Sequence, residues 1–220
     1  MNIFDIIGPV MIGPSSSHTA GAARIGRVSA KILGETVKTA KIALSGSFAE
    51  TGEGHGTDKA IIAGLLGMTP DDERIPNSFD FAKKAGLEFK FEKVSIPRSH
   101  PNTALLNLEG EKGKSCTVQG ASIGGGNIII TAVNGMETSF SGSEDTLIIA
   151  HEDMPGLIAS VTSILNDFRI NIGNFRLNRT RKGSLAVMIV EIDGTMNDDA
   201  LLILKKLPHI SSVVYLKAIV

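Results

Sequence analysis

Apolar positions recur with two different periods along the chain, and these periods predict the elements of the last third of the sequence. Alternation of apolar and polar residues is typical of strands, and apolar residues at every third or fourth position are typical of helices. These patterns predict strands at 146–151, 170–180, 184–192 and 213–219 and helices at 155–168 and 197–207. The order β-α-β-β-α-β is the ferredoxin-like arrangement. We expect Asp153 and the Pro155–Gly156 pair to start the first helix, and Asn197 or Asp198 to cap the second.

The first part of the chain mixes both periods and predicts an α+β domain. The patterns predict a helix from the serine run at 15–19 to about Leu33, helices at 57–66 and 77–86, and strands at 41–44, 88–96, 103–109, 114–120 and 127–133. The clear alternation in residues 87–94 predicts a half-buried antiparallel strand. Segment 139–146 is small, polar and acidic, which indicates a domain boundary. We therefore expect an α+β domain at 1–142 and a ferredoxin-like domain at 146–220.

The charge of the chain argues against one class of partner. The chain has 220 residues, of which 42% are hydrophobic, and its formal net charge is −1. Nucleic acid is therefore not expected as the main partner, because phosphate binding needs clustered lysine and arginine. The nearest basic cluster consists of Arg176, Arg179, Arg181 and Lys182. We interpret it as a solvated hairpin turn.

Cys116 is the only cysteine. The chain therefore cannot form an internal disulfide, which is typical of proteins of the reducing cytoplasm. A single thiolate also cannot hold an iron–sulfur cluster or a structural zinc ion. The N-terminus lacks the basic start of a signal peptide, and no apolar run approaches the roughly 20 residues that cross a bilayer. We expect a cytoplasmic location, no membrane partner and a buried, inert thiol at Cys116.

The segment GPSSSHTAGAARIG, residues 13–26, is the first candidate for chemistry. Serines just ahead of a helix provide side-chain caps and free backbone N–H groups, which attract a carboxylate or a phosphate. His18 would lie in the first turn, where the positive helix end favours the neutral imidazole. The small residues Ala20, Gly21 and Ala22 permit close approach of another backbone. The alternative interpretation is a capped helix without further function.

The segment TGEGHGTDKAIIAGLLG, residues 51–67, is the second candidate. His55 lies between glycines, which allow a loop to approach a ligand closely, and Thr57 and Asp58 can cap the helix that follows. A histidine in such a loop is a candidate proton-transfer group. The alternative is an ordinary histidine of a surface loop.

Three further segments carry weaker indications. His100 stands between Ser99 and Pro101, where a turn residue is the simplest interpretation. Segment 121–130, ASIGGGNIII, has three consecutive glycines entering a strand, which indicates a backbone that another group approaches; it does not have the spacing of a dinucleotide fingerprint. Segments 151–161, HEDMPGLIASV, and 171–175, NIGNF, can together cradle an amino acid, with its carboxylate at the helix N-terminus. The alternative is a capped loop used for packing.

These motifs resemble a known family. Residues 1–140, through GPSSSHTAGAARIG, GEGHGTDKAIIAGLLG, the His100 segment and SIGGG, resemble the beta chain of the iron–sulfur-dependent L-serine dehydratases. Residues 146–220 resemble an ACT regulatory domain. The first domain also resembles the intervening, effector-binding domain of some D-3-phosphoglycerate dehydrogenases.

The resemblance implies a reaction, a cofactor and a partner. The reaction is the α,β-elimination of L-serine to pyruvate and ammonia. A 4Fe-4S cluster would be held by cysteines of a separate alpha chain, and its open iron would act as Lewis acid on the serine hydroxyl. Some family members carry the cysteine-bearing domain on the same polypeptide, whereas this sequence ends after the ACT-like part. We therefore expect a subunit that is inactive alone and requires the alpha chain.

The resemblance also implies roles for individual residues. His55 matches the histidine expected to be the general base, and His100 matches one expected to orient the substrate. The motif Ser15, Ser16, Ser17, His18 and Thr19 would face the cluster or the substrate carboxylate.

In the ACT-like part, His151, Asp153 and Asn171 occupy positions that bind L-serine in serine-regulated relatives. Those relatives carry asparagine where this chain has Asp153, which leaves the effector open. A homodimer contact through the ACT-like domain is also expected. A purely regulatory, amino-acid-binding subunit without catalytic residues is the alternative function.

Overall fold

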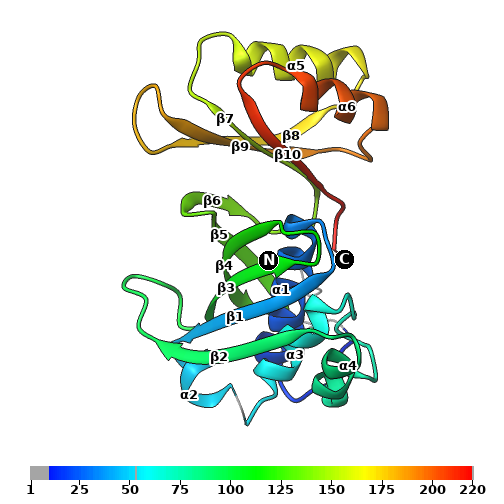
Figure 1. The fold of residues 1–220 in the computed structure, drawn as a ribbon, viewed down its shortest axis with the longest axis vertical. Helices are drawn as coiled ribbons and strands as arrows, with labels where there is room; N and C mark the ends of the chain where they lie inside the picture. Colours follow the sequence, from blue (N-terminus) through cyan, green and yellow to red (C-terminus); the bar gives the residue numbers. More distant parts are fainter. Residues whose placement is uncertain (1–9, 53, 220) are drawn as a thin grey trace. The chain divides into compact units, whose positions relative to one another are not determined.

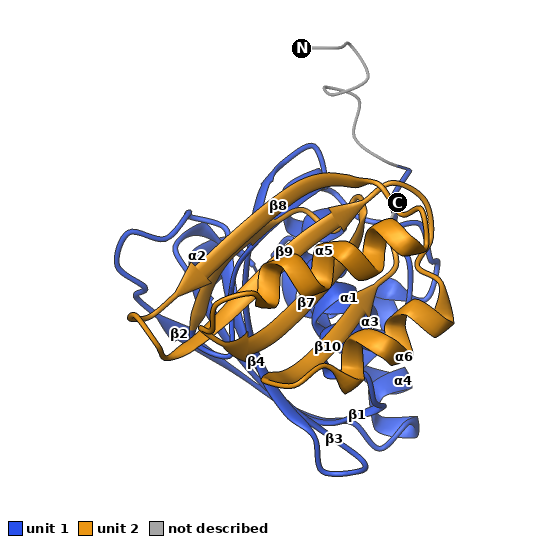
Figure 2. Cartoon of the chain, turned by 90° about the horizontal axis from the view of Figure 1, so that it is seen from above, with its two compact units in different colours: residues 1–135 blue, residues 136–220 orange. Residues whose placement is uncertain are grey.

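The computed structural model describes residues 10–52 and 54–219 (Figure 1). The chain divides into two compact units, residues 1–135 and 136–220, which Figure 2 shows in different colours. Both units combine a sheet with helices, so the predicted α+β fold class is confirmed. Each unit is described by itself below.

A mixed sheet organises the first unit. Within this unit the strands follow the order β2-β1-β3-β4-β5. They are β1 (Val37–Ser45), β2 (Glu88–Val94), β3 (Thr103–Gly110), β4 (Ser115–Gly124) and β5 (Asn127–Val133). The next strand along the chain, β6 (Met136–Phe140), belongs to the second unit. Alternate residues of β1 and β3, such as Ile42, Leu106 and Leu108, are almost completely buried. One face of the sheet therefore supplies the core, and α1 packs against β3 and β4 on that face.

Two helices cross closely in this unit. A π-helical turn, η2 (Ser16–Gly21), leads into α1 (Ala22–Leu33), which packs against α3 (Thr57–Leu65). A side chain at Gly64 would collide with the Ala23 carbonyl oxygen of α1, since its Cβ would lie 2.1 Å from that atom. The remaining helices are α2 (Ser47–Thr51), η3 (Ile75–Asn77) and α4 (Ser78–Lys84). Glycine at position 64 therefore permits the close approach of α1 and α3.

The predicted antiparallel strand at 87–94 is wrong in its direction. β2 pairs in parallel with β1, from Thr39 opposite Glu88 to Ser45 opposite Val94. The chain between the two strands forms α2, α3 and α4, and such a helical crossover returns the chain in its original direction. Alternation arises because β2 is an edge strand with one half-buried face, and it carries no information about direction.

Most predicted elements of the first unit are present, and three short elements of the chain were missed. The missed elements are the helical turns α2 and η3 of the first unit and strand β6 of the second. A five-residue helix has too few positions to show a period, and β6 lies close to the polar segment at 139–146. Strand β4 is also longer than predicted, because it continues to Gly124 in the glycine run.

The second unit confirms the predicted order β-α-β-β-α-β. After β6, its strands are β7 (Asp145–Glu152), β8 (Ile172–Arg179), β9 (Leu185–Ile192) and β10 (Ile210–Leu216), and its helices are α5 (Leu157–Asp167) and α6 (Asp198–Lys206). The strands β7 to β10 lie in the order β10-β7-β9-β8. Both helices cover one face, where Leu147, Val161 and Leu204 are completely buried.

The predicted start of α5 needs a correction. Asp153 does not cap this helix, which begins after Gly156 without a side-chain cap. The Asp153 carboxylate instead accepts hydrogen bonds from the Arg179 guanidinium at 2.6 Å and from the Gly183 amide at 2.9 Å. Asn197 caps α6 as predicted, by accepting from the amides of Asp199 and Ala200. The Asp153 carboxylate therefore binds an arginine and a turn amide instead of capping α5.

Within residues 10–52 and 54–219, no helix has the length and apolarity needed to cross a membrane.

The contact between α1 and α3 gives a first test. We expect Gly64→Ala to lower the free energy of unfolding by about 1–3 kcal/mol, because the added methyl group must push two backbones apart. Urea denaturation monitored by circular dichroism measures this change. Ser163→Ala, at an exposed position of α5, is the control and should change it by less than about 0.5 kcal/mol. An equal effect of both substitutions would refute the close-packing interpretation.

Candidate functional site

Four of the sequence motifs meet in one region of the first unit. The turn at Gly46–Ser47 contacts the His100 segment, because the Phe48 amide donates to the Pro101 carbonyl at 3.4 Å. The glycine-rich segment joins the same region, since the Ser122 amide donates to the Asn102 carbonyl at 3.0 Å. Gly21 in turn lies against the Ser122 side chain. Segments that are far apart in sequence therefore surround η2, which carries His18.

His18 is nearly buried, with 9% of its surface exposed, and its imidazole is held on both sides. Its Nε2 lies 3.1 Å from the Thr51 hydroxyl and 3.3 Å from the Ser47 hydroxyl. Its Nδ1 lies 3.5 Å from the hydroxyl of Ser15, which also accepts a hydrogen bond from the His18 amide at 3.2 Å. The ring packs edge-on against Phe48. These contacts fix the orientation of the imidazole.

The Thr51 hydroxyl determines which nitrogen of His18 carries the hydrogen. This hydroxyl donates to the Ser47 carbonyl at 2.9 Å, which uses its single hydrogen. It therefore accepts from Nε2–H of His18, and Nδ1 of the neutral ring faces Ser15 as an acceptor. The ring acts as a hydrogen-bond donor toward α2.

The surroundings of His18 lower its pKa below the ordinary value of 6.5. Burial is the largest cause, since it removes water from the charged form, and the nearby His55 adds like-charge repulsion. A hydrogen bond with Ser47 acts in the opposite direction. The neutral imidazole that the sequence predicted thus has a different origin, in burial and in a second histidine.

His55 is exposed and lies beside His18, with the two ring centroids 4.9 Å apart. Its Nδ1 lies 3.1 Å from the Thr51 carbonyl oxygen, which also accepts from the His55 amide at 3.2 Å. A carbonyl can only accept, so Nδ1 carries the hydrogen. In the neutral ring Nε2 therefore carries the lone pair, and it has no hydrogen-bond partner among the residues that the structure describes. This is the arrangement that a general base requires.

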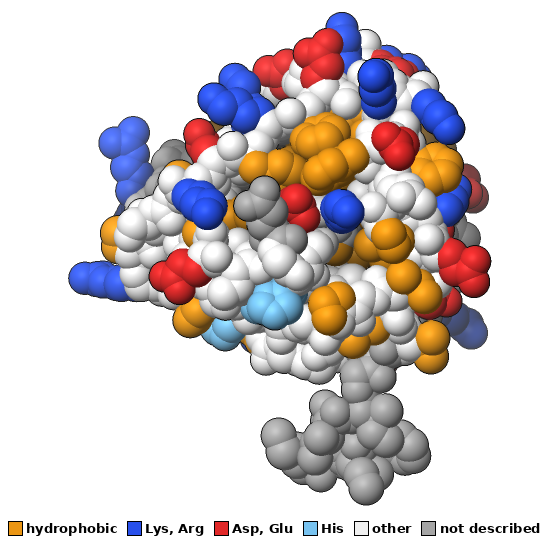
Figure 3. Space-filling view, turned by 90° about the horizontal axis from the view of Figure 1, so that it is seen from below, with side chains coloured by type: hydrophobic (Ala, Val, Ile, Leu, Met, Phe, Trp, Pro, Cys, Tyr) orange, Lys and Arg blue, Asp and Glu red, His pale blue; other side chains and the backbone are white. Residues whose placement is uncertain are grey.

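His55 lines a pocket of about 240 Å³ beside η2. The pocket is bounded by the segment before the serine run, by the loop around His55 and by the first turns of α3 and η3. Its lining consists of Ile12, Gly13, Pro14, Thr19, Gly54, His55, Gly56, Lys59, Ile75 and Pro76. Figure 3 shows histidine side chains at the surface of the molecule, close to apolar side chains. Because His55 is exposed and lines this pocket, a small ligand can reach it.

The serine motif contributes unequally. Ser15 contacts His18, whereas Ser16 and Ser17 are half-buried in the same π-helical turn. Thr19 is 2% exposed and lines the pocket, and its hydroxyl has no hydrogen-bond partner among the described residues. The turn of this segment holds the His18 ring between Ser15 and α2, and Thr19 lines the pocket.

His100 lies in the neighbouring turn and makes no described contact with His18 or His55. It is exposed, and its Nδ1 accepts from the Asn102 amide at 3.1 Å. The neutral ring therefore carries its hydrogen on Nε2 and can donate to a ligand.

The three candidate effector residues do not converge within one chain. His151 is 2% exposed, and its Nδ1 donates to the Glu152 carbonyl at 2.7 Å, while Asp153 binds the turn before β9. Asn171 precedes β8 and donates to Asp193 at 2.6 Å. Since β8 pairs with β9 from Ile172 opposite Ile192, Asn171 lies at the other end of this sheet.

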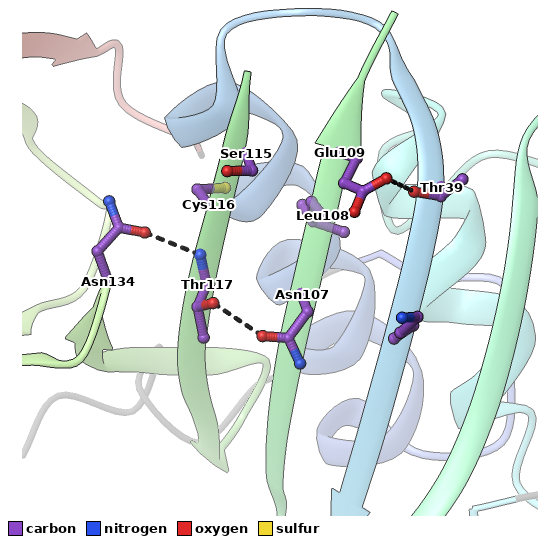
Figure 4. Close-up of a pocket in the computed structure, with 9 residues that line it drawn as sticks. Thr39, Asn107, Leu108, Glu109, Ser115, Cys116, Thr117 and Asn134 are labelled. Carbon is purple, nitrogen blue, oxygen red and sulfur yellow. Dashed lines mark hydrogen bonds between the residues drawn. The ribbon is translucent and has the colours of Figure 1, made fainter. Parts of the chain in front are cut away.

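A second pocket, of about 160 Å³, lies on the sheet of the first unit (Figure 4). Its polar side chains bind one another: Thr117 donates to Asn107 and Thr39 donates to Glu109. Cys116 borders this pocket, is 7% exposed, and burial raises the pKa of its thiol to about 11. The prediction that the Cys116 thiol is buried is confirmed, and its raised pKa favours the protonated form.

A metal centre is not built by this part of the chain. Among the described residues, no group of three or more histidine, cysteine, aspartate or glutamate side chains could hold a metal ion. An iron–sulfur cluster needs several thiolates, and the single thiol here is buried and protonated. The donor set therefore does not fit such a cluster.

Sequence reasoning missed Ser47, Thr51 and Lys59. Thr51 stands four residues before His55. Its carbonyl contacts His55 and its hydroxyl contacts His18, and the sequence indicates neither contact. Ser47 follows β1, which no motif marked. Lys59 directly follows the GHGTD segment, and this position next to a candidate motif could have marked it as a candidate residue.

Comparison with known proteins identifies the family of this chain. Residues 2–86 match the family model described as serine dehydratase beta chain, and residues 146–209 match the ACT domain. The chain is 46% identical over 212 residues to a probable L-serine dehydratase beta chain of Bacillus subtilis, covering 96% of each chain. It is 37% identical over 196 residues to the L-serine dehydratase beta chain of Peptoniphilus asaccharolyticus, covering 89% of this chain and 88% of the relative.

A third relative is more distant. The D-3-phosphoglycerate dehydrogenase of Bacillus subtilis is 28% identical over 200 residues, which span 90% of this chain and 37% of that protein. This similarity supports the predicted resemblance to a regulatory part of that enzyme. The extent and identity of the first two matches, together with the ACT domain, establish that the chain belongs to the family of L-serine dehydratase beta chains.

Proposed function

We propose that this chain is the beta subunit of an L-serine dehydratase, in which it supplies the proton-transfer group for the conversion of L-serine to pyruvate and ammonia. The observation that carries the proposal is the geometry of His55. Its Nδ1–H is held by a backbone carbonyl, and its Nε2 lone pair is available in a small pocket. In an α,β-elimination the base removes the α-proton, the Cα–H electrons form the C=C bond and the β-hydroxyl leaves. The resulting enamine tautomerises and is hydrolysed to pyruvate and ammonia.

The second half of the site belongs in this proposal to a separate alpha chain. That chain would hold a 4Fe-4S cluster, because the single buried thiol of this chain cannot. The cluster would supply the Lewis acid for the leaving hydroxyl. The purified beta chain alone is then inactive. Such clusters and free thiols fit a reducing cytoplasm, which is the location we propose.

His18 has a supporting role in this proposal. Its lowered pKa keeps it neutral, so it does not repel the positive charge that His55 gains with the α-proton. The Nε2–H bond to Thr51 fixes the hydroxyl of the residue whose carbonyl orients His55. His100 can donate its Nε2–H to the substrate from the adjacent turn.

A purely regulatory function is the alternative. The similarity to a phosphoglycerate dehydrogenase over 90% of this chain favours it. In that case substitutions of His18, His55 and His100 would alter the response to an effector and would leave the maximal rate unchanged. Kinetics on the reconstituted two-chain enzyme separate the alternatives.

The assignment of His55 as the base can be tested by removing its side chain and adding free imidazole in its place. In the anaerobically reconstituted enzyme, His55→Gly should lower kcat about 10²- to 10⁴-fold, the range of general acid–base catalysis. Added imidazole should restore part of this loss, and α-deuterated L-serine should give a larger isotope effect than in wild type. Pyruvate formation is the measurement. His209→Gln is the matched control, since His209 is exposed in the second unit. Full activity of the His55 variant would refute the base assignment.

The effect of burial and of His55 on the pKa of His18 can be tested by varying the pH. Nuclear magnetic resonance titration should place the pKa of His18 below 6.5, and His55→Gln should raise that pKa because one like charge is removed. Since the folded state binds the proton more weakly than the unfolded state, this group makes the free energy of unfolding rise with pH up to about pH 6.5. Below the lowered pKa the contribution is constant. Urea denaturation of wild type and His18→Gln at several pH values measures the difference, which should vanish if His18 is unperturbed.

We further propose that the ACT domain binds an amino-acid effector between two copies of the chain. Asp153 and Asn171 lie at opposite ends of β8 and β9, so one chain cannot bring them to one ligand. Edge strand β8 can pair with β8 of a second copy in antiparallel orientation. A two-fold axis would then place Asn171 of one copy near Asp153 of the other, with the buried His151 behind it.

Mixing of variants tests this shared site. L-serine should shift the nuclear magnetic resonance signal of His151 in wild type, and should not do so in Asp153→Ala or Asn171→Ala. Random mixing of the two variants should restore about one quarter of the sites, because half of the dimers are mixed and one of their two sites is intact. No recovery on mixing, in a protein that stays dimeric, would contradict a site shared between copies.

A further inference from the structure

The pocket beside His55 contains a polar atom that no residue in 10–52 or 54–219 satisfies. The Thr19 hydroxyl is buried without a hydrogen-bond partner among the described residues. A buried hydroxyl without a partner costs about 1–3 kcal/mol, so such groups usually have a ligand or water as partner. Because Thr19 lines the pocket, its hydroxyl indicates that a ligand with a hydrogen-bonding group occupies this space.

Lys59 supplies the only cation among the residues that line this pocket. It is half-buried on the first turns of α3, and it forms no salt bridge with a residue that the structure describes. Its backbone is fixed, because its carbonyl accepts from the Ser78 hydroxyl at 2.8 Å. The remaining lining is apolar or glycine apart from Thr19 and His55. An anionic group of the ligand would therefore lie at Lys59.

We propose that Lys59 binds the α-carboxylate of the amino-acid substrate, with the Thr19 hydroxyl as a second donor, an assignment that rests on the function proposed above. The pocket volume of about 240 Å³ is below the range of about 300–1,000 Å³ of drug-sized ligands and so fits a small amino acid. A carboxylate held at one end of the pocket places the α-carbon next to it. The Nε2 lone pair of His55, which lines the same pocket, then faces the α-proton.

This assignment gives Lys59 a specificity role that differs from proton transfer. An ammonium bound to a carboxylate discriminates ligands by the presence of that group. A lysine that served as base, or one that only supported the fold of α3, would affect all ligands of the pocket alike. The comparison of carboxylate and carboxylate-free ligands therefore separates these roles.

The first experiment uses the anaerobically reconstituted two-chain enzyme. Lys59→Gln should lower kcat/KM for L-serine about 10- to 100-fold, mainly through KM, as expected for loss of a hydrogen bond to a charged group. The inhibition constant of D-serine should rise by a similar factor, while that of serinol, which lacks the carboxylate, should stay unchanged. Lys59→Arg should recover part of the loss, and Lys83→Gln on the exposed side of α4 is the matched control. Equal losses for D-serine and serinol, or a fall in kcat alone, would overturn the assignment.

The second experiment is independent of activity. The full chain has five histidines, and the nuclear magnetic resonance signal of His55 is identified as the one lost in His55→Gln. L-serine should shift this signal saturably in wild type and much more weakly in Lys59→Gln, and serinol should not distinguish the two proteins. A mixture without pyruvate formation would refute the proposed function, and this titration would still decide on Lys59. An unchanged L-serine titration in Lys59→Gln would overturn the carboxylate assignment whatever the activity.

Discussion

The candidate site depends on one residue, Thr51, whose backbone and side chain act on two different histidines. Its carbonyl accepts the Nδ1–H of His55, and its hydroxyl accepts the Nε2–H of His18. The first bond leaves Nε2 of His55, a residue that lines the pocket, as the atom with the lone pair, and the second fixes the buried imidazole of His18 beside it. Because both bonds start at one residue, the tautomers of the two rings are set together. A backbone carbonyl, and not a carboxylate, thus orients the His55 ring.

The position of Thr51 follows from the way β1 ends. Gly46 has φ 59° and ψ −131°, a conformation that a residue with a side chain rarely adopts. A Cβ at this position would lie 2.5 Å from the Pro101 carbonyl oxygen. The chain can therefore turn directly from the strand into α2 and stay in contact with the His100 segment. The single turn of α2 then places Ser47 and Thr51 on the side of His18.

The elements and the chemistry were predictable from the sequence to different degrees. The ferredoxin-like order followed from periodicity, because each element is long enough to show its period. The direction of β2 did not, since alternation reports only that one face is buried. His55 and His18 were recognisable from their glycine and serine neighbours. Their contact with each other, and the part of Thr51 in it, depend on a fold of α2 that a five-residue segment does not reveal. Lys59 was missed because the sequence does not show that this lysine lines the same pocket as His55.

In the function proposed above, the geometry also gives a physical reason for dividing the chemistry between two chains. His55 is exposed, so water solvates its Nε2 and weakens every electrostatic contact in the pocket. Elimination proceeds faster where water is excluded and where fixed groups meet the charges that develop. A partner chain that covers the pocket would bring its Lewis acid to the substrate hydroxyl and would remove that water in the same step. His18 is already neutral and buried before such a partner binds, so closure does not enclose a second charge beside the base. In the proposed two-chain enzyme, the orientation of the buried His18 is therefore fixed before the partner binds. Only the environment of the exposed His55 would change on association.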